Sequence, residues 1–118
     1  MAYFEELSIW QQAKELTKGV YEMMQDSRDW GFRDQIQRAA VSIMNNIAEG
    51  SESGSSPAYI HFLNVAKGSS AEVRSMLYLC EEFGYCTAEQ KERMSDLCRM
   101  ISAGINSLIR YQQSSVQK

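Results

Sequence analysis

Residues 35–50 read QIQRAAVSIMNNIAEG, and they place two ordered stripes of side chains along one predicted helix. Side chains three and four positions apart share a helix face. The apolar stripe consists of Ile36, Ala40, Ile43 and Ile47. The polar stripe consists of Arg38, Ser42, Asn46 and Glu49. A surface helix usually carries one apolar stripe and a varied polar back, so the ordered polar stripe is a candidate site or interface.

Outward from this stretch, the chain divides into four helical segments. We predict helices over about residues 5–25, 33–50, 57–83 and 88–113, with the WGF segment at 30–32 as the first connection. Gly50 is expected to adopt a left-handed cap conformation, and Ser56 followed by Pro57 marks a helix start. Gly84 is expected to end the third helix, and Thr87 with Gln90 forms a capping box for the fourth.

Short connections between long helices predict an all-α, up-down-up-down antiparallel four-helix bundle. Residues 1–113 are expected to form a single domain, and residues 114–118 a frayed C-terminal tail. Heptad spacing on the third helix selects Tyr59, Phe62, Ala66, Ser69, Val73, Met76, Cys80 and Phe83 as its core face. The same spacing on the fourth selects Met94, Leu97, Ile101, Gly104, Leu108 and Tyr111.

The apolar content exceeds what one bundle core requires, which is about three positions in seven. The surplus positions are Trp10, Tyr21, Met44, Ile60, Leu63 and Leu77. Small residues that allow close helix approach are Gly19, Ala66, Gly68, Ser69, Ser70, Ala103 and Gly104. Either the monomer has a wide core, or a helix face is buried against a second subunit. We favour the oligomer.

Composition excludes several classes of protein. The content is 44% hydrophobic and 23% charged, typical of a globular domain. The net charge of −3 gives no overall attraction to nucleic acid or anionic lipid. The start, MAYFEELSIW, lacks a basic segment followed by an apolar run, and no stretch has the length of a membrane span. With three cysteines, an odd number, we expect reduced thiols and a cytoplasmic location.

Catalytic and metal sites find little support in the residues. The chain has one histidine, His61, and no Glu-x-x-His motif of a di-iron bundle. Cys80 falls on the predicted core face, whereas Cys86 lies near a turn where it can be exposed. Glu49 and Glu72 are candidates for a carboxylate pair, but a nearby arginine would keep both ionised and structural. We therefore expect no enzyme activity, no metal and no cofactor.

The polar stripe has three interpretations: a solvated face, a hydrogen-bonded network between helices, or a ligand or RNA contact. In the network, Arg38 holds a carboxylate while Ser42 and Asn46 bond across the helix contact, and such networks fix helix pairing. We favour this network. Its candidate assembly residues are Arg38, Ser42, Asn46, Glu49, Ser69 and Glu72.

Basic residues do not form a run. On the fourth helix Lys91, Arg93, Arg99 and Arg110 alternate with Glu89, Glu92 and Asp96, which predicts a salt-bridged solvent face. If RNA is a partner, the candidate phosphate contacts are Lys14, Lys18, Arg33, Lys67 and Arg74.

Three segments together carry a family resemblance. They are Trp10-x2-Ala13-x2-Leu16 with Val20-Tyr21, then Gln35-Ile36-x-Arg38-Ala39-x-x-Ser42-Ile43-x-x-Asn46-Ile47-Ala48-Glu49-Gly50, then Phe62-Leu63-x-x-Ala66-x-Gly68-Ser69-x-x-Glu72. Over roughly residues 4–110 the chain resembles the four-helix bundle proteins encoded in bacterial ribosomal-RNA intervening sequences. That family includes the accessory variability determinants of diversity-generating retroelements.

The resemblance implies a four-helix bundle that assembles as a homopentamer and has no known catalytic activity. For the retroelement branch it also implies binding of RNA and of a reverse transcriptase through a strongly basic surface. The pI of this chain, near 5.2, departs from that basic character. The expected function is therefore a homo-oligomeric binding or scaffolding module, with an RNA-binding accessory protein as the alternative.

Overall fold

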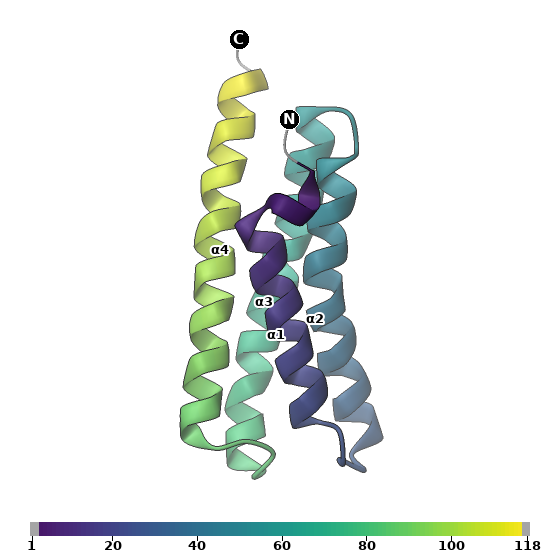
Figure 1. Cartoon of the computed structure of the whole chain (residues 1–118), viewed down its shortest axis with the longest axis vertical. Coiled ribbons are helices and arrows are strands. Elements are labelled where there is room, and N and C mark those ends of the chain that lie inside the picture. The colour runs from purple at the N-terminus through teal and green to yellow at the C-terminus, as the bar shows by residue number, and fades with distance from the viewer. Residues whose placement is uncertain (1–2, 117–118) are drawn as a thin grey trace.

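A computed structural model describes residues 3–116. A short 3-10 helix, η1 (Phe4–Glu6), precedes four α-helices: α1 (Ser8–Met23), α2 (Trp30–Ser51), α3 (Ser56–Glu82) and α4 (Ala88–Val116). The described residues contain no strand, and the four helices run alternately up and down in one elongated bundle (Figure 1). The predicted all-helical fold is confirmed. None of these helices has both the length and the apolar character that crossing a bilayer would require.

The packing order places each helix in one corner of the bundle. α1 and α3 each pack beside both α2 and α4, but no Cα atom of α1 lies within 8 Å of one in α3. They therefore occupy diagonal corners. The bundle has four sides, one between each pair of neighbouring helices: α1–α2, α2–α3, α3–α4 and α4–α1.

The core consists of aliphatic side chains contributed by all four helices. The largest fully buried side chains include Leu16, Ile36, Ile43, Ile47, Leu63, Leu77, Ile101 and Ile105. Burying a side chain of this size stabilises the fold by roughly 1.5–3 kcal/mol.

The core face of α3 is rotated from the predicted heptad. The buried positions are Leu63, Ala66, Ser70, Val73, Met76, Leu77 and Cys80. Phe83 is instead 54% exposed. On α4 the buried set includes Met94, Cys98, Ile101, Ile105 and Ile109, whereas Tyr111 is 68% exposed. Leu63 and Leu77, predicted as surplus, are core residues.

Helix boundaries differ from the predicted ones at four places. Leu7 has an extended backbone, so η1 and α1 replace the single predicted helix from residue 5. Asp29 caps α2 by accepting a hydrogen bond from the Phe32 N–H, so Trp30 belongs to the first turn of α2. Ser55, one residue before the predicted cap, caps α3. α4 continues to Val116, beyond the predicted start of the frayed tail, and residues 117–118 lie outside the described part.

Gly50 has a different role from the expected one. It is buried inside α2, and a Cβ there would lie 2.8 Å from Cδ1 of Tyr59 and 3.0 Å from Cβ of Phe62. Glycine is therefore present because α3 approaches closely, and not because a left-handed cap is needed. Gly84 does have a left-handed backbone, with φ of 77°, and it follows the end of α3 as predicted.

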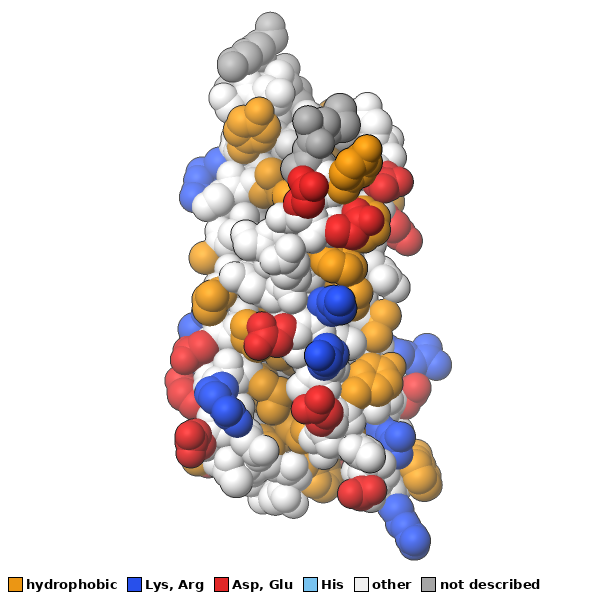
Figure 2. All heavy atoms as spheres, viewed as in Figure 1, with side chains coloured by type: hydrophobic (Ala, Val, Ile, Leu, Met, Phe, Trp, Pro, Cys, Tyr) orange, Lys and Arg blue, Asp and Glu red, His pale blue; other side chains and the backbone are white. Residues whose placement is uncertain are grey.

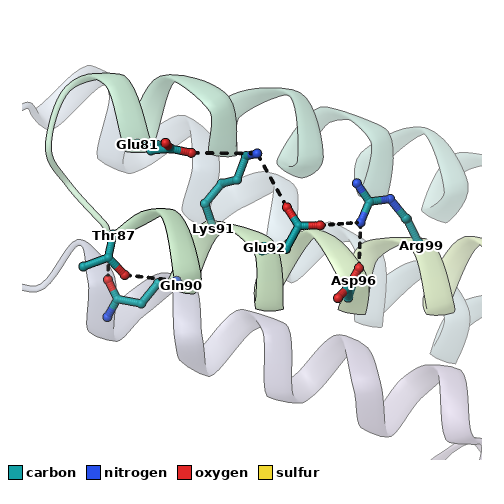
Figure 3. Close-up of polar contacts among 7 residues, drawn as sticks. All are labelled: Glu81, Thr87, Gln90, Lys91, Glu92, Asp96 and Arg99. Carbon is teal, nitrogen blue, oxygen red and sulfur yellow. Dashed lines mark hydrogen bonds and ion pairs between the residues drawn. The ribbon is translucent and has the colours of Figure 1, made fainter.

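The predicted capping box at the start of α4 is confirmed. The Thr87 N–H donates to Oε1 of Gln90 at 2.8 Å, and the Gln90 N–H donates to Oγ1 of Thr87 at 3.1 Å (Figure 3). At the same end of the bundle, the Tyr85 hydroxyl donates to Oδ2 of Asp29 at 2.6 Å. This bond ties the α3–α4 loop to the α1–α2 loop.

Candidate functional site

The middle of the polar stripe lies in the contact between α2 and α3. The Ser42 and Ser69 hydroxyls share a hydrogen bond of 2.9 Å across the two helices. The side-chain amide of Asn46 donates to the Ser42 carbonyl at 2.8 Å and to its hydroxyl at 3.0 Å. We call Ser42, Asn46 and Ser69 the α2–α3 polar contact. It joins two helices of one chain, and its groups are already bonded to one another.

The outer members of the stripe do not belong to this contact. Arg38 pairs with Asp34 of its own helix at 2.9 Å, and their side chains are 79% and 62% exposed. Arg38 therefore holds a carboxylate, as expected, but that carboxylate belongs to its own helix, so the pair does not join α2 to α3. Glu72 accepts a hydrogen bond from Nε2 of Gln35 at 3.3 Å, and Glu49 is exposed.

The candidate carboxylate pair is not formed. Glu72 lies level with Gln35, which is 14 positions before Glu49 on α2. At 1.5 Å per residue the two carboxylates are separated by roughly 20 Å along the bundle. Glu49 and Glu72 therefore cannot share a proton or a substrate atom.

A second polar contact joins α3 and α4, and the sequence analysis missed it. The Ser70 hydroxyl, fully buried, donates to the Cys98 carbonyl at 3.1 Å and accepts from the Ser102 hydroxyl at 3.3 Å. Further along, Lys67 donates from Nζ to Oδ1 of Asn106 at 3.2 Å. We call Ser70, Ser102, Lys67 and Asn106 the α3–α4 polar contact. The signal that could have found it is the other heptad register of α3, which places Ser70 among apolar core positions.

The outer face of α4 carries the predicted network of charges. Arg99 bonds Asp96 at 2.7 Å and Glu92 at 3.4 Å, and Lys91 lies 3.7 Å from Glu92 and 3.8 Å from Glu81 (Figure 3). The salt-bridged face is confirmed for Lys91, Glu92, Asp96 and Arg99, whereas no ion pair of Glu89, Arg93 or Arg110 is found among the described residues. Its charges neutralise one another, and exposed pairs of this kind contribute about 0–1 kcal/mol each.

The candidate phosphate contacts are divided between distant parts of the bundle. Lys14 and Lys18 lie on α1, and Lys67 and Arg74 lie on the diagonal helix α3. Within one chain they therefore do not form a single stripe. Figure 2 shows acidic and basic side chains interleaved on the face that includes α1.

Two of the candidate basic residues stack on tryptophan rings. The Lys14 ammonium lies 5.7 Å from the Trp10 ring centre, and the Arg33 guanidinium lies 5.5 Å from that of Trp30. Such contacts contribute roughly 0.5–1 kcal/mol at exposed sites. They hold the cations beside large aromatic surfaces on both α1 and α2.

All three cysteines are free and buried. Burial raises the pKa of the Cys80 thiol to about 12 and that of Cys98 to about 11. Burial also raises the pKa of Cys86, which is 9% exposed, so the expectation of an exposed thiol there is wrong. Protonated buried thiols are poor nucleophiles.

No metal-ligand cluster of three His, Cys, Asp or Glu side chains is found among residues 3–116. His61 is exposed on α3 and contacts the ring of Phe62 edge-to-face. A hollow of about 580 Å³ lies between η1, the α2–α3 loop and the end of α4. Its lining includes Phe4, Tyr59 and Gln112 but none of the residues of the α2–α3 polar contact.

Comparison with known proteins agrees with this architecture. The family described as "23S rRNA-intervening sequence protein" matches over residues 5–107. A crystal structure of a protein of unknown function from the S23 ribosomal protein family of Bacteroides thetaiotaomicron is similar, with a TM-score of 0.79 and 25% identity. That match covers 86% of this chain and 97% of the other. No curated protein matches the chain. The chain therefore belongs to the 23S rRNA-intervening sequence protein family.

Proposed function

We propose that the protein is a non-enzymatic homo-oligomer, a ring of five four-helix bundles, that serves as a binding or scaffolding module in the cytoplasm. The observation that carries this proposal is the set of large apolar side chains left exposed outside a well-filled core. They include Tyr21, Trp30, Val65, Leu79 and Phe83, at 40–64% exposure. Apolar surface of this kind marks contacts with other molecules.

A non-catalytic role is supported by the state of the polar groups. The hydroxyls and amide of the α2–α3 polar contact bond one another, and the thiols of Cys80, Cys86 and Cys98 are buried with raised pKa values. Ser42, Asn46 and Ser69 thus order helices within one chain. Assembly then depends on side chains beside this contact.

Light scattering coupled to size-exclusion chromatography tests the proposal. We expect a mass near five times the 13.5 kDa of one chain. A mass of 13.5 kDa at every concentration would reject the oligomer, and a stable assembly of another size would reject the pentamer alone.

RNA binding is the second candidate, and one observation favours it. Trp30 is 64% exposed and carries Arg33 over its ring, an arrangement on which an unpaired base can stack. A filter-binding titration with single-stranded RNA, repeated at rising salt, tests this role. Retention that weakens steeply with salt and is reduced in Trp30→Ala would support it, and no retention at low salt would reject it.

A further inference from the structure

The side of the bundle between α1 and α2 presents aromatic and basic groups. Thr17 donates to the Ala40 carbonyl at 3.2 Å, which marks where α1 meets α2. Trp10 and Tyr21 lie seven and four positions from Thr17, and Met44 lies four positions from Ala40, so all three share this side. Figure 2 shows hydrophobic side chains gathered along this boundary beside basic ones on α1. We call Trp10, Lys14, Tyr21, Arg33 and Met44 the α1–α2 surface.

The neighbouring side, between α2 and α3, presents aliphatic, aromatic and acidic groups. Val65 lies four positions before Ser69, Leu79 lies seven after Glu72, and Phe83 lies four after Leu79. Their exposures are 40%, 40% and 54%. Glu49 and Glu72 are exposed on the same side. We call Glu49, Val65, Glu72, Leu79 and Phe83 the α2–α3 surface.

These two surfaces complement each other in charge. Lys14 and Arg33 give the α1–α2 surface two basic groups, and Glu49 and Glu72 give the α2–α3 surface two acidic groups. The ridge of α2 between them carries the Arg38–Asp34 pair, which is neutral as a unit. Opposite potentials on two patches of one molecule favour contact between unlike patches of two copies.

The α3–α4 side differs from both. Its exposed ring, Tyr78, is covered by the Lys91 ammonium at 4.4 Å from the ring centre, and Lys91 is in turn close to Glu81 and Glu92. Lys67 is engaged with Asn106. The exposed ring and the two lysines on this side are therefore engaged with groups of the same chain.

The size and position of the two surfaces suit a closed ring. One side of the bundle measures roughly 50 by 20 Å, comparable to the area of about 800 Å² that each partner buries in a stable interface. Both surfaces adjoin α2, so they face directions about a right angle apart. If each copy binds the next through two adjacent sides, the direction of the chain of subunits turns at each contact, and the ring closes after about four or five copies. Contacts through opposite sides would give a filament instead.

We infer that the α1–α2 surface of one copy binds the α2–α3 surface of the next. This inference rests on the proposed function, and it adds that the contact is head-to-tail between two different surfaces. A second copy of the chain is the occupant of both.

Three exposed positions on helices provide the test: Tyr21→Glu on the α1–α2 surface, Leu79→Glu on the α2–α3 surface, and Met100→Glu on α4 as the matched control. Met100 is 51% exposed. A carboxylate placed inside an apolar interface loses its hydration without gaining a partner. We expect Tyr21→Glu and Leu79→Glu each to fall to the mass of one chain, while Met100→Glu keeps the wild-type mass and circular dichroism stays helical in all three. If a glutamate variant loses helicity, Tyr21→Ser and Leu79→Ser replace the pair.

Mixing the two monomeric variants is the decisive step. Each retains one intact surface, and these two intact surfaces are complementary, so native mass spectrometry of the mixture should show a heterodimer that neither variant forms alone. A mixture that stays monomeric would overturn the head-to-tail contact. An oligomeric wild type whose two surface variants remain assembled would overturn this inference and leave the proposed function standing. A monomeric wild type would overturn both.

Discussion

Ser69 and Ser70 are neighbours in sequence, yet they serve opposite sides of α3. Ser69 is half-buried and bonds Ser42 of α2, whereas Ser70 is fully buried and bonds Cys98 and Ser102 of α4. Beside Ser69, the molecule leaves apolar side chains exposed; beside Ser70, polar and charged groups engage one another. The α3–α4 side thus bonds within one chain, whereas the α2–α3 side is available to bind another chain.

The largest expected effect concerns the α3–α4 side, through the buried thiol of Cys98. Burial raises the pKa of this thiol to about 11 in the folded chain, from an ordinary value of 9.0. Between these values the unfolded chain releases a proton that the folded chain retains, so the free energy of unfolding falls as pH rises. The loss is roughly 1.4 kcal/mol per pH unit for each such thiol. Urea denaturation at a series of alkaline pH values measures it.

Cys98→Ala should reduce the slope of the free energy of unfolding against alkaline pH by the contribution of one proton. Ser42→Ala, in the α2–α3 polar contact, should leave the slope as it is in the wild type and serves as the control. Equal slopes in Cys98→Ala and the wild type would show that this thiol does not link stability to pH.

Replacing Ser69 or Ser70 with valine compares the α2–α3 polar contact directly with the α3–α4 polar contact. Ser70→Val adds volume at a position with no exposed surface and leaves the Ser102 hydroxyl without its acceptor, so it should destabilise the chain by about 1–3 kcal/mol. Ser69→Val, at a half-buried position, should cost less than about 1 kcal/mol. Chemical denaturation of both variants measures the difference. A larger cost at Ser69 would reverse our ranking of the two contacts.

The smallest expected effect concerns the two glycines of α2. Gly50→Ala should destabilise the chain by about 1 kcal/mol, because its Cβ would lie 2.8 Å from the Tyr59 ring, and the ring must shift. Gly31→Ala meets no atom within 4 Å and should stabilise it by about 0.5–1 kcal/mol. Thermal unfolding of the two variants should therefore give shifts of opposite sign. If Gly50→Ala raises the melting temperature as Gly31→Ala does, the approach of α3 at Gly50 is looser than described.

The sequence was sufficient to predict the number of α-helices and the helix ends that depend on a few adjacent residues. The capping box at Thr87 and Gln90 and the glycine after α3 depend on adjacent residues, and both are present. The core face of α3 was less determined. Both Phe62 and Leu63, and both Met76 and Leu77, are apolar, so two heptad registers fit the pattern. Only packing against α2 and α4 selects Leu63 over Phe62 and buries Leu77 together with Met76.

The polar residues were harder to assign for the same reason. Ser42 and Ser69 both follow from regular spacing on their helices, and they meet across the contact. The partner of Arg38 depends on side-chain geometry, and it is Asp34, one turn away on the same helix. Gly50 illustrates a second limit: sequence alone does not distinguish a glycine that ends a helix from one that admits a neighbouring ring.

The central claim is that this bundle is one subunit of a homo-oligomer, and the mass of the wild-type chain in dilute buffer tests it most directly. Sedimentation equilibrium over a range of concentrations should give a single species of about five times 13.5 kDa. A species of 13.5 kDa throughout that range would contradict the account.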